Sequence, residues 1–431
     1  MYMPRSRVIL IGIFGLLALF FALLFLGIIP GLQEDAKSKT PLTFWGVFDS
    51  KDVIDSVSAS VPGYTITYRQ FSPQTYESEL LNALAAGNGP DVFMFHNSWL
   101  PKHADKIAPV TARDLSIGSL RDYFPTVVEQ DFAPDRQTIY ALPLYMDTLA
   151  LLYNRDIFDT KGVPLPPKNW SEFLATIPKL REIDSTGRIT KAAAAIGGSG
   201  KSINRASDLL SEIMLQAGVS MTSNDYGRAT FSTNGLQPLL FYTQFANSAS
   251  EAYTWSDAFG NSIDSFADGS TAMMFNYSYQ IPILLQKNPF LSIGVAPFPQ
   301  PAGAEANPVN FANYWGVAVA SQTRVPTEAW QFILKLTTDE SIAGTYANAT
   351  GRLPALKSLI SARLNDPIWG VFANAALSAR SWPQIDNNAV DQIFSNLIEN
   401  VITGKSDAAR ALQEAERSVT SLMERQRSTT F

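Results

Sequence analysis

Short apolar runs and amphipathic stretches alternate along most of the chain. Residues 42–48, 64–71, 91–95 and 149–153 have the β-branched and aromatic composition of strands. Residues 76–86, 171–180, 328–336 and 407–426 place apolar side chains at helical spacing, and Ser406 can cap the last of these helices. The chain begins β-β-α-β, which predicts an α/β body with a mostly parallel, helix-covered sheet.

One segment, residues 192–218, resembles a nucleotide-binding loop. Gly200, Lys201 and Ser202 end a near-match to the P-loop pattern, but Ala195 stands where its first glycine belongs. The alanine run before it lacks the β-branched residues typical of a buried parallel strand. The pattern therefore favours a glycine-rich turn and an amphipathic helix, capped by Ser202 and ended by Gly218, over phosphate binding.

The N-terminal segment contains an apolar run, residues 8–29, without a charged side chain. A helix needs about 20 apolar residues to span the hydrocarbon core, so this run is long enough. It is longer than the apolar region of a signal peptide, and no small-residue cleavage site follows it. These features favour an uncleaved transmembrane helix, and inefficient cleavage is the alternative.

Positive charge precedes the apolar run. Arg5 and Arg7 lie before it, and residues of mixed sign follow it. By the positive-inside rule, residues 1–32 form a cytoplasmic tip and membrane anchor, and residues 33–40 form a linker. The protein is expected in the cell membrane, with its body extracytoplasmic, where ATP is not available.

The composition of the body limits its partners. Close to four hundred residues follow the anchor, which is long enough for two lobes. The net charge is -6 and the basic residues are dispersed, which argues against a nucleic-acid partner. Aromatic residues make up 11% and charged residues 17%, a balance that suits neutral polar ligands such as sugars.

The sequence offers little for catalysis. It contains two histidines, His96 and His103, and no cysteine, so neither a zinc site nor another cofactor is expected. No G-x-S-x-G motif occurs. Several carboxylates could still pair for glycoside cleavage: Asp147, Asp257, Asp264, Asp268 and Asp386. The interpretation is a protein that is not an enzyme, with a membrane-anchored carbohydrate-active enzyme as the alternative.

Several motifs, taken in order, carry a family resemblance. They are GPDVFMFHNSW (89–99), YALPLYMDTLALLYNRDIF (140–158), PPKNWSEF (166–173), FADGSTAMMFNYSY (266–279) and TGRLPALKS (350–358). Together they resemble extracellular solute-binding family 1 of ABC importers, which includes maltodextrin-binding proteins. The resemblance covers residues 42–424 and implies a two-lobed periplasmic-binding-protein-like fold of type II. It implies lobes at 41–147 plus 296–345 and at 148–295 plus 346–431, closing on a solute delivered to ABC permease transmembrane subunits.

The resemblance also implies a ligand site in the cleft between the lobes. The implied cleft residues are Asn97, Ser98, Trp99, Asp147, Tyr279, Tyr314, Trp315, Arg352 and Trp382. Asn97 and Ser98 are neutral where maltodextrin binders have an acid and a base, which departs from a maltose site. Asp147 is alternatively a hinge residue bonded to backbone, and the aromatic residues are alternatively core. Arg352 could bind a phosphate or carboxylate, which keeps a glycerol-phosphate-like ligand open. A sensor or adhesion module is a further alternative.

Overall fold

The computed structural model describes residues 15–21, 23 and 39–429. Most of the predicted membrane span, residues 8–29, and most of the predicted linker, residues 33–40, lie outside the described residues. Among the residues that are described, no helix combines the length and apolar character that crossing a bilayer requires.

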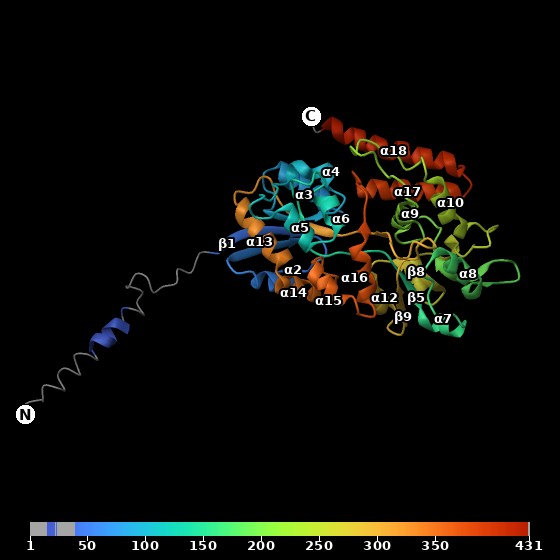
Figure 1. Ribbon diagram of the computed structural model, residues 1–431, viewed down its shortest axis with the longest axis horizontal. Helices are drawn as coiled ribbons and strands as arrows, with labels where there is room; N and C mark the ends of the chain where they lie inside the picture. The colour runs from blue at the N-terminus through green and yellow to red at the C-terminus, as the bar shows by residue number, and fades with distance from the viewer. Residues whose placement is uncertain (1–14, 22, 24–38, 430–431) are drawn as a thin grey trace, which may run out of the picture.

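Two separate five-stranded sheets organise the chain (Figure 1). The first sheet contains, in spatial order, β2 (Tyr64–Gln70), β1 (Thr40–Gly46), β3 (Val92–His96), β11 (Trp315–Val319) and β4 (Leu142–Pro143). β1 pairs in parallel with β2 and β3, whereas β11 pairs antiparallel with β3 and β4. This sheet is therefore mixed, where the sequence predicted a mostly parallel one.

Helices that connect the strands cover the first sheet. The predicted helix 76–86 is confirmed as α3 (Tyr76–Ala85). A second helix, α2 (Lys51–Ala59), lies between β1 and β2 and was not predicted, so the chain begins β-α-β-α-β. The Ser50 hydroxyl caps α2 by accepting from the Val53 N–H at 3.4 Å. Val53, Ile54 and Val57 are β-branched and lower its intrinsic helix propensity, so packing against β2 stabilises it.

The second sheet contains β6 (Glu182–Ile183), β7 (Ile189–Ala195), β8 (Thr271–Asn276), β5 (Ala150–Asn154) and β9 (Ile293–Ala296). β7 and β8 are parallel, and β5 is antiparallel to both β8 and β9. α8 (Trp170–Leu180) packs on β7. Its aromatic residues Trp170 and Phe173 contact Phe275 and Phe298 to form a core in which truncation to alanine costs about 3–5 kcal/mol.

The alanine run before the near P-loop is a strand, contrary to the prediction. Ala192–Ala195 are almost fully buried in β7, which pairs in parallel with β8 and packs against α8. The turn after β7 requires glycine: Gly197 has φ +95°, and a Cβ there would lie 2.8 Å from the Ala246 nitrogen. This crowding explains the glycines without a phosphate ligand.

The helix after this turn, α9 (Ala206–Gln216), begins later than predicted. Ser202 does not cap it, because its hydroxyl donates to Asp257 at 2.7 Å and accepts from the Trp255 indole at 3.0 Å. Arg205 occupies the capping position in a left-handed conformation with φ 68°. The helix thus begins at the residue that follows Arg205 in the chain.

Three segments that run between the two sheets lie side by side. The first joins β4 to β5, the second joins β9 to β11, and the third follows α16 (Trp369–Leu377). β10 (Asn310–Phe311) in the second segment pairs with β12 (Ala379–Arg380) in the third. Thr148 in the first segment forms a bridge to Ala312 in the second. Adjacent crossings of this kind are the geometry of a hinge.

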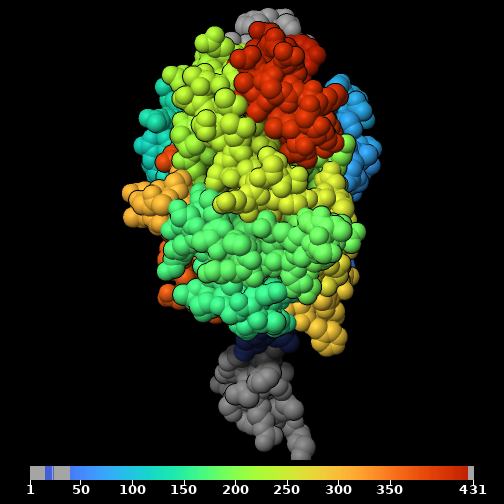
Figure 2. Space-filling model, turned by 90° about the vertical axis from the view of Figure 1, so that its right-hand side faces the viewer, coloured from blue at the N-terminus to red at the C-terminus, as the bar shows by residue number. Residues whose placement is uncertain are grey.

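The last two helices, α17 (Asn387–Ile402) and α18 (Ala408–Thr429), pack on each other beside the second sheet. α18 is capped by Asp407, whose carboxylate accepts from the Arg410 N–H at 3.0 Å, and not by Ser406 as predicted. Figure 2 shows α18 in red against the yellow-green segment that holds α10 (Leu236–Thr243). Thr420 fixes this contact by accepting from the Ala229 N–H at 3.1 Å.

Further helices complete the two bodies. They are α4 (Leu100–His103), α5 (Ile117–Tyr123), α6 (Thr126–Phe132), α7 (Arg155–Thr160), α11 (Ser262–Ala267), α12 (Gln280–Lys287), α13 (Pro326–Thr338), α14 (Glu340–Thr350) and α15 (Lys357–Arg363). α13 packs on β11, α14 packs against α2, and α15 packs against α5, so these three helices lie with the first sheet.

Candidate functional site

A cavity of about 700 Å³ lies at strand ends of both sheets. Phe48 follows β1, His96 ends β3 and Tyr279 follows β8, so the carboxyl ends of these strands open into it. Its lining residues are Phe48, Pro73, Gln74, Glu77, Ser78, His96, Trp99, Tyr145, Asp147, Arg205, Tyr279, Ile283, Asn313, Trp315, Arg352, Asn387 and Asn388. The cavity is of the size of a small-ligand site and combines rings with polar groups.

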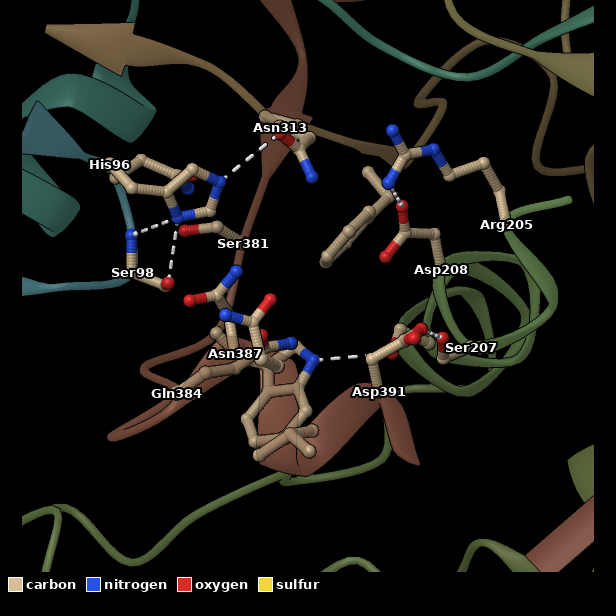
Figure 3. A pocket seen from close by; sticks show the side chains of 17 residues that line it. His96, Ser98, Arg205, Ser207, Asp208, Asn313, Ser381, Gln384, Asn387 and Asp391 are labelled. Atoms are coloured by element: carbon tan, nitrogen blue, oxygen red, sulfur yellow. Dashed lines mark hydrogen bonds and ion pairs between the residues drawn. The ribbon is translucent and has the colours of Figure 1, made fainter. Parts of the chain in front are cut away.

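A second cavity of about 110 Å³ adjoins the first and shares part of its lining (Figure 3). The shared residues are His96, Arg205, Asn313, Asn387 and Asn388. We call the larger one the main cavity and the smaller one the inner cavity. Together they form one continuous candidate site.

The structure brings eight of the nine predicted site residues to these cavities. Trp99, Asp147, Tyr279, Trp315 and Arg352 line the main cavity, and Asn97, Ser98 and Trp382 line the inner one.

Tyr314 lines neither cavity. Its side chain is fully buried, and its hydroxyl donates to Asp131 Oδ2 at 2.7 Å. Because the strand alternates faces, Tyr314 points into the core of the first body while its neighbour Trp315 faces the cavity. The prediction of a cleft role for Tyr314 is therefore corrected to a core role.

The partly buried carboxylate of Asp131 accepts hydrogen bonds from several residues near the inner cavity. Asp131 accepts from Asn97 Nδ2 at 3.0 Å as well as from Tyr314, and Ser381 also donates to it. Burial raises the pKa of Asp131 to about 6. The Asn97 amide nitrogen is therefore already bonded inside the protein. The indole N–H of Trp382 likewise donates within the protein, to the Ser211 hydroxyl at 3.3 Å.

Asp147 has the backbone partners of a hinge residue. Its carboxylate accepts from the Thr148 N–H at 3.0 Å, the Ser278 N–H at 3.1 Å and the Ser278 hydroxyl at 2.8 Å. Burial raises the pKa of Asp147 to about 6. These bonds tie the first crossing segment to the turn that carries Tyr279.

Aromatic rings form opposite parts of the main cavity. Trp315 lies 5.0 Å from Trp99 and 5.6 Å from Phe48 between ring centroids, all on the first-sheet side. Tyr279 on the second-sheet side stacks on Tyr277 with centroids 6.0 Å apart and planes inclined by 17°. Such rings offer flat apolar faces to a ligand.

Two arginines line the main cavity. Arg352 forms an ion pair with the buried Asp49 at 2.7 Å, and its guanidinium lies 4.5 Å from the Tyr145 ring centroid. Arg205 donates through Nε to the Tyr279 hydroxyl at 3.0 Å. Sequence reasoning missed Arg205, because it interrupts a pattern that was interpreted as continuous helix. It also missed Phe48, which no local motif marks.

A charged cluster borders the cavity on the first-sheet side. Glu77 accepts from Lys102 at 2.7 Å and from His103 Nε2 at 2.8 Å. Burial raises the pKa of Glu77, but these hydrogen bonds outweigh it and bring the pKa to about 2. Lys102 also contacts Asp386 at 3.1 Å, next to the start of α17. The Trp99 indole donates to Asn387 Oδ1 at 3.0 Å and adds a second link to α17.

His96 lacks the features of a catalytic base. Its Nδ1 contacts the Ser98 hydroxyl at 2.8 Å and accepts from the Ser98 N–H at 3.3 Å, while Nε2 contacts Asn313 Oδ1 at 3.2 Å. Burial lowers the pKa of His96 to about 4, so the ring is neutral and weakly basic. In the described ranges, no group of three metal-binding side chains occurs either.

Two α/β bodies, joined by adjacent crossings and sharing a cavity of rings and polar groups, define a hinged ligand-binding fold. The family model described as "Bacterial extracellular solute-binding protein" matches residues 53–369. The chain belongs to this family, and the resemblance stated from its sequence is confirmed.

Individual relatives are distant in sequence but similar in length and fold. The maltotriose-binding protein of Pyrococcus abyssi is 24% identical, over 78% of this chain and 70% of that protein. The sugar-binding protein MalE of Xanthomonas citri is 20% identical with a TM-score of 0.74, covering 91% of this chain and 99% of that one. An ABC transporter solute-binding protein of Thermotoga lettingae, bound to α-D-tagatose, is 22% identical with a TM-score of 0.69, covering 89% and 100%.

Proposed function

We propose that this protein is the solute receptor of an ABC importer and binds a sugar or oligosaccharide in the main cavity. The observation that carries the proposal is the pairing of rings across that cavity, with Trp315 and Trp99 on one side and Tyr279 on the other. Sugar C–H faces lie on such rings, and the polar groups between them can bond the hydroxyls. Relatives named for maltotriose and tagatose support this class of ligand.

The receptor is proposed to close on its solute by a hinge motion. The moving parts are the two predicted lobes, residues 41–147 plus 296–345 and 148–295 plus 346–431. Because α14 packs against α2 and α15 against α5, we place both helices with the first lobe, beyond the expected boundary at 345. Closure would bring Tyr279 toward Trp315 and exclude water from the solute.

The N-terminal apolar run, residues 8–29, is proposed to remain as an uncleaved membrane anchor with the body outside the cell membrane. Its length and the preceding Arg5 and Arg7 support this topology. The partners would be the permease transmembrane subunits. N-terminal sequencing of the protein from membranes tests the anchor, and a mature chain that starts after residue 29 would exclude it.

The receptor is proposed to perform no chemistry on its solute. Two observations support this part of the proposal. His96 is weakly basic, and the carboxylate of Asp147 already accepts hydrogen bonds from Ser278.

Thermal unfolding of the full-length protein in detergent, repeated across a panel of saccharides, tests the receptor function. A ligand present at 100 times its dissociation constant adds about 2.7 kcal/mol and raises the melting temperature. The saccharide that raises it should be recovered unchanged after prolonged incubation. Recovery of cleaved saccharide would favour the carbohydrate-active enzyme instead.

A further inference from the structure

The two asparagine amides of the main cavity have their oxygens occupied. Asn387 Oδ1 accepts from the Trp99 indole at 3.0 Å, and Asn313 Oδ1 faces His96 Nε2 at 3.2 Å. An indole N–H can only donate, and His96 Nδ1 accepts from Ser98, so Nε2 must be a donor too. Both amides are therefore fixed in orientation, and neither NH₂ group has an acceptor within the described part of the chain.

Arg205 also has unused donors. Its Nε and Nη2 both donate to the Tyr279 hydroxyl, and Nη1 forms an ion pair with Asp208 Oδ2 at 3.9 Å, a distance too long for a hydrogen bond. The side chain is 38% exposed, and it lines both cavities. Figure 3 shows its guanidinium and the Asn313 amide at the rim of the same opening. A left-handed backbone is unfavourable for arginine, yet here it sets the side chain at this position.

Arg352 adds a second guanidinium to the main cavity. Only its Nη1 is engaged, with Asp49 at 2.7 Å and the Tyr346 hydroxyl at 3.0 Å. Nε and Nη2 have no acceptor among the residues described.

The acceptors of the main cavity are largely taken. Both oxygens of Asp147 accept from Ser278, and one also accepts from Thr148. Glu77 is ionised, but Lys102 and His103 both bond its Oε1 and compensate its charge. Glu77 Oε2 accepts no hydrogen bond within the described part of the chain. The lining still offers more unused donors than unused acceptors, and these donors include two guanidinium groups, each of which is ion-paired with one carboxylate, Arg205 with Asp208 and Arg352 with Asp49.

We propose that the solute of this cavity carries an anionic group, a carboxylate or a phosphate on a sugar, and that Arg205 recognises it. This inference rests on the proposed function and narrows its solute class to acidic sugars. A guanidinium bonds either anion through paired N–H groups, and the amides of Asn313 and Asn387 supply further donors. A neutral sugar brings hydroxyls that both donate and accept, and it would leave this donor excess unmatched.

Calorimetric titration with matched neutral and acidic sugars tests the inference. The probes are glucose, glucuronate and glucose 6-phosphate, followed by galactobiose and digalacturonate. At least one acidic member should bind about ten- to a hundredfold more tightly than its neutral match, and its affinity should weaken at high salt. Glucuronate against glucose 6-phosphate distinguishes a carboxylate from a phosphate, and inorganic phosphate alone shows whether the sugar is needed.

Variants locate the effect at Arg205. Arg205→Gln should remove the preference for the acidic member, Arg205→Lys should retain part of it, and the exposed control Arg113→Gln should leave it unchanged. Should Arg205→Gln fail to fold, Arg205→Lys still locates the effect, and the salt dependence of the wild-type protein shows whether recognition is ionic. Equal or tighter binding of the neutral members would overturn the inference and leave the proposed function intact. Binding of no saccharide at all would contradict both.

Discussion

Arg205 and Tyr279 are joined in two ways, since Arg205 Nε donates to the Tyr279 hydroxyl at 3.0 Å and its guanidinium carbon lies 5.7 Å from the ring centroid. The pair fixes a flat ring and a cation on the second-sheet side of the main cavity, facing the indoles of the first. A ring held in this way is available to a ligand without a further loss of side-chain freedom.

Tyr279→Ala should therefore weaken solute binding about tenfold or more, with little change in the melting temperature of the free protein. The ring lines the cavity and is not fully buried, so its removal leaves no closed void. Titration calorimetry and thermal unfolding of the variant measure both effects. A loss of about 3 kcal/mol in stability with normal binding would instead identify Tyr279 as a core residue.

Tyr314→Phe should lower the stability of the protein and leave solute binding unchanged, the opposite of Tyr279→Ala. Its fully buried hydroxyl donates to the partly buried carboxylate of Asp131, and removing this donor costs about 1–3 kcal/mol of unfolding free energy. Urea unfolding measures this loss, and binding by the folded protein should be unchanged. Weaker binding at unchanged stability would instead show that Tyr314 is a ligand-site residue.

The free energy of unfolding of the Asp147→Asn variant should increase relative to that of the wild type as pH rises. The pKa of Asp147 is about 6 in the folded protein and ordinarily about 3.9 in an unfolded chain, so the folded state binds more protons between these values. The Asp147 contribution therefore lowers stability as pH rises through this window. Asparagine does not titrate.

The difference in unfolding free energy between the Asp147→Asn variant and the wild type should therefore shift by about 2 kcal/mol toward the variant from pH 4.5 to pH 7.5. Urea unfolding of both proteins at the two pH values measures it. An identical difference at both values would show that Asp147 titrates normally.

Lys201→Ala should leave solute binding and nucleotide behaviour unchanged. Lys201 forms an ion pair with Glu399 at 2.7 Å, and its side chain is 68% exposed, so solvent screens the pair and it contributes little to stability. Neither the wild type nor the variant should bind ATP in an equilibrium titration. Saturable ATP binding that disappears in Lys201→Ala would restore the P-loop interpretation.

Local patterns in the sequence predicted many elements of the fold. β2, α3, β3 and α8 lie within one residue of the expected bounds, because each has a clear period and a stop signal such as Gly87. The errors occur where tertiary contacts override local preference. Alanine has low strand propensity, yet Ala192–Ala195 lie in β7, where pairing with β8 and packing against α8 outweigh that preference.

Less of the candidate site than of the fold could be predicted from the sequence. Trp99 and Arg352 belong to motifs that carry the family resemblance, whereas Trp315 was expected in the cleft from the resemblance alone, and the structure places all three at the main cavity. Arg205 and Asn387 lie at the starts of helices whose first residues depend on backbone conformations that no periodicity indicates. The alternation that turns Tyr314 inward and Trp315 outward depends on the register between β11 and β3.

We propose that the main cavity holds the solute between aromatic rings of the two bodies. Titration calorimetry of the wild type and of Trp315→Ala, with the saccharide that raises the melting temperature most, tests it most directly. We expect saturable one-to-one binding by the wild type and an affinity at least about tenfold weaker in the variant, with the fold retained. Equal affinity in both proteins, or no saturable binding by the wild type to any saccharide, would contradict it.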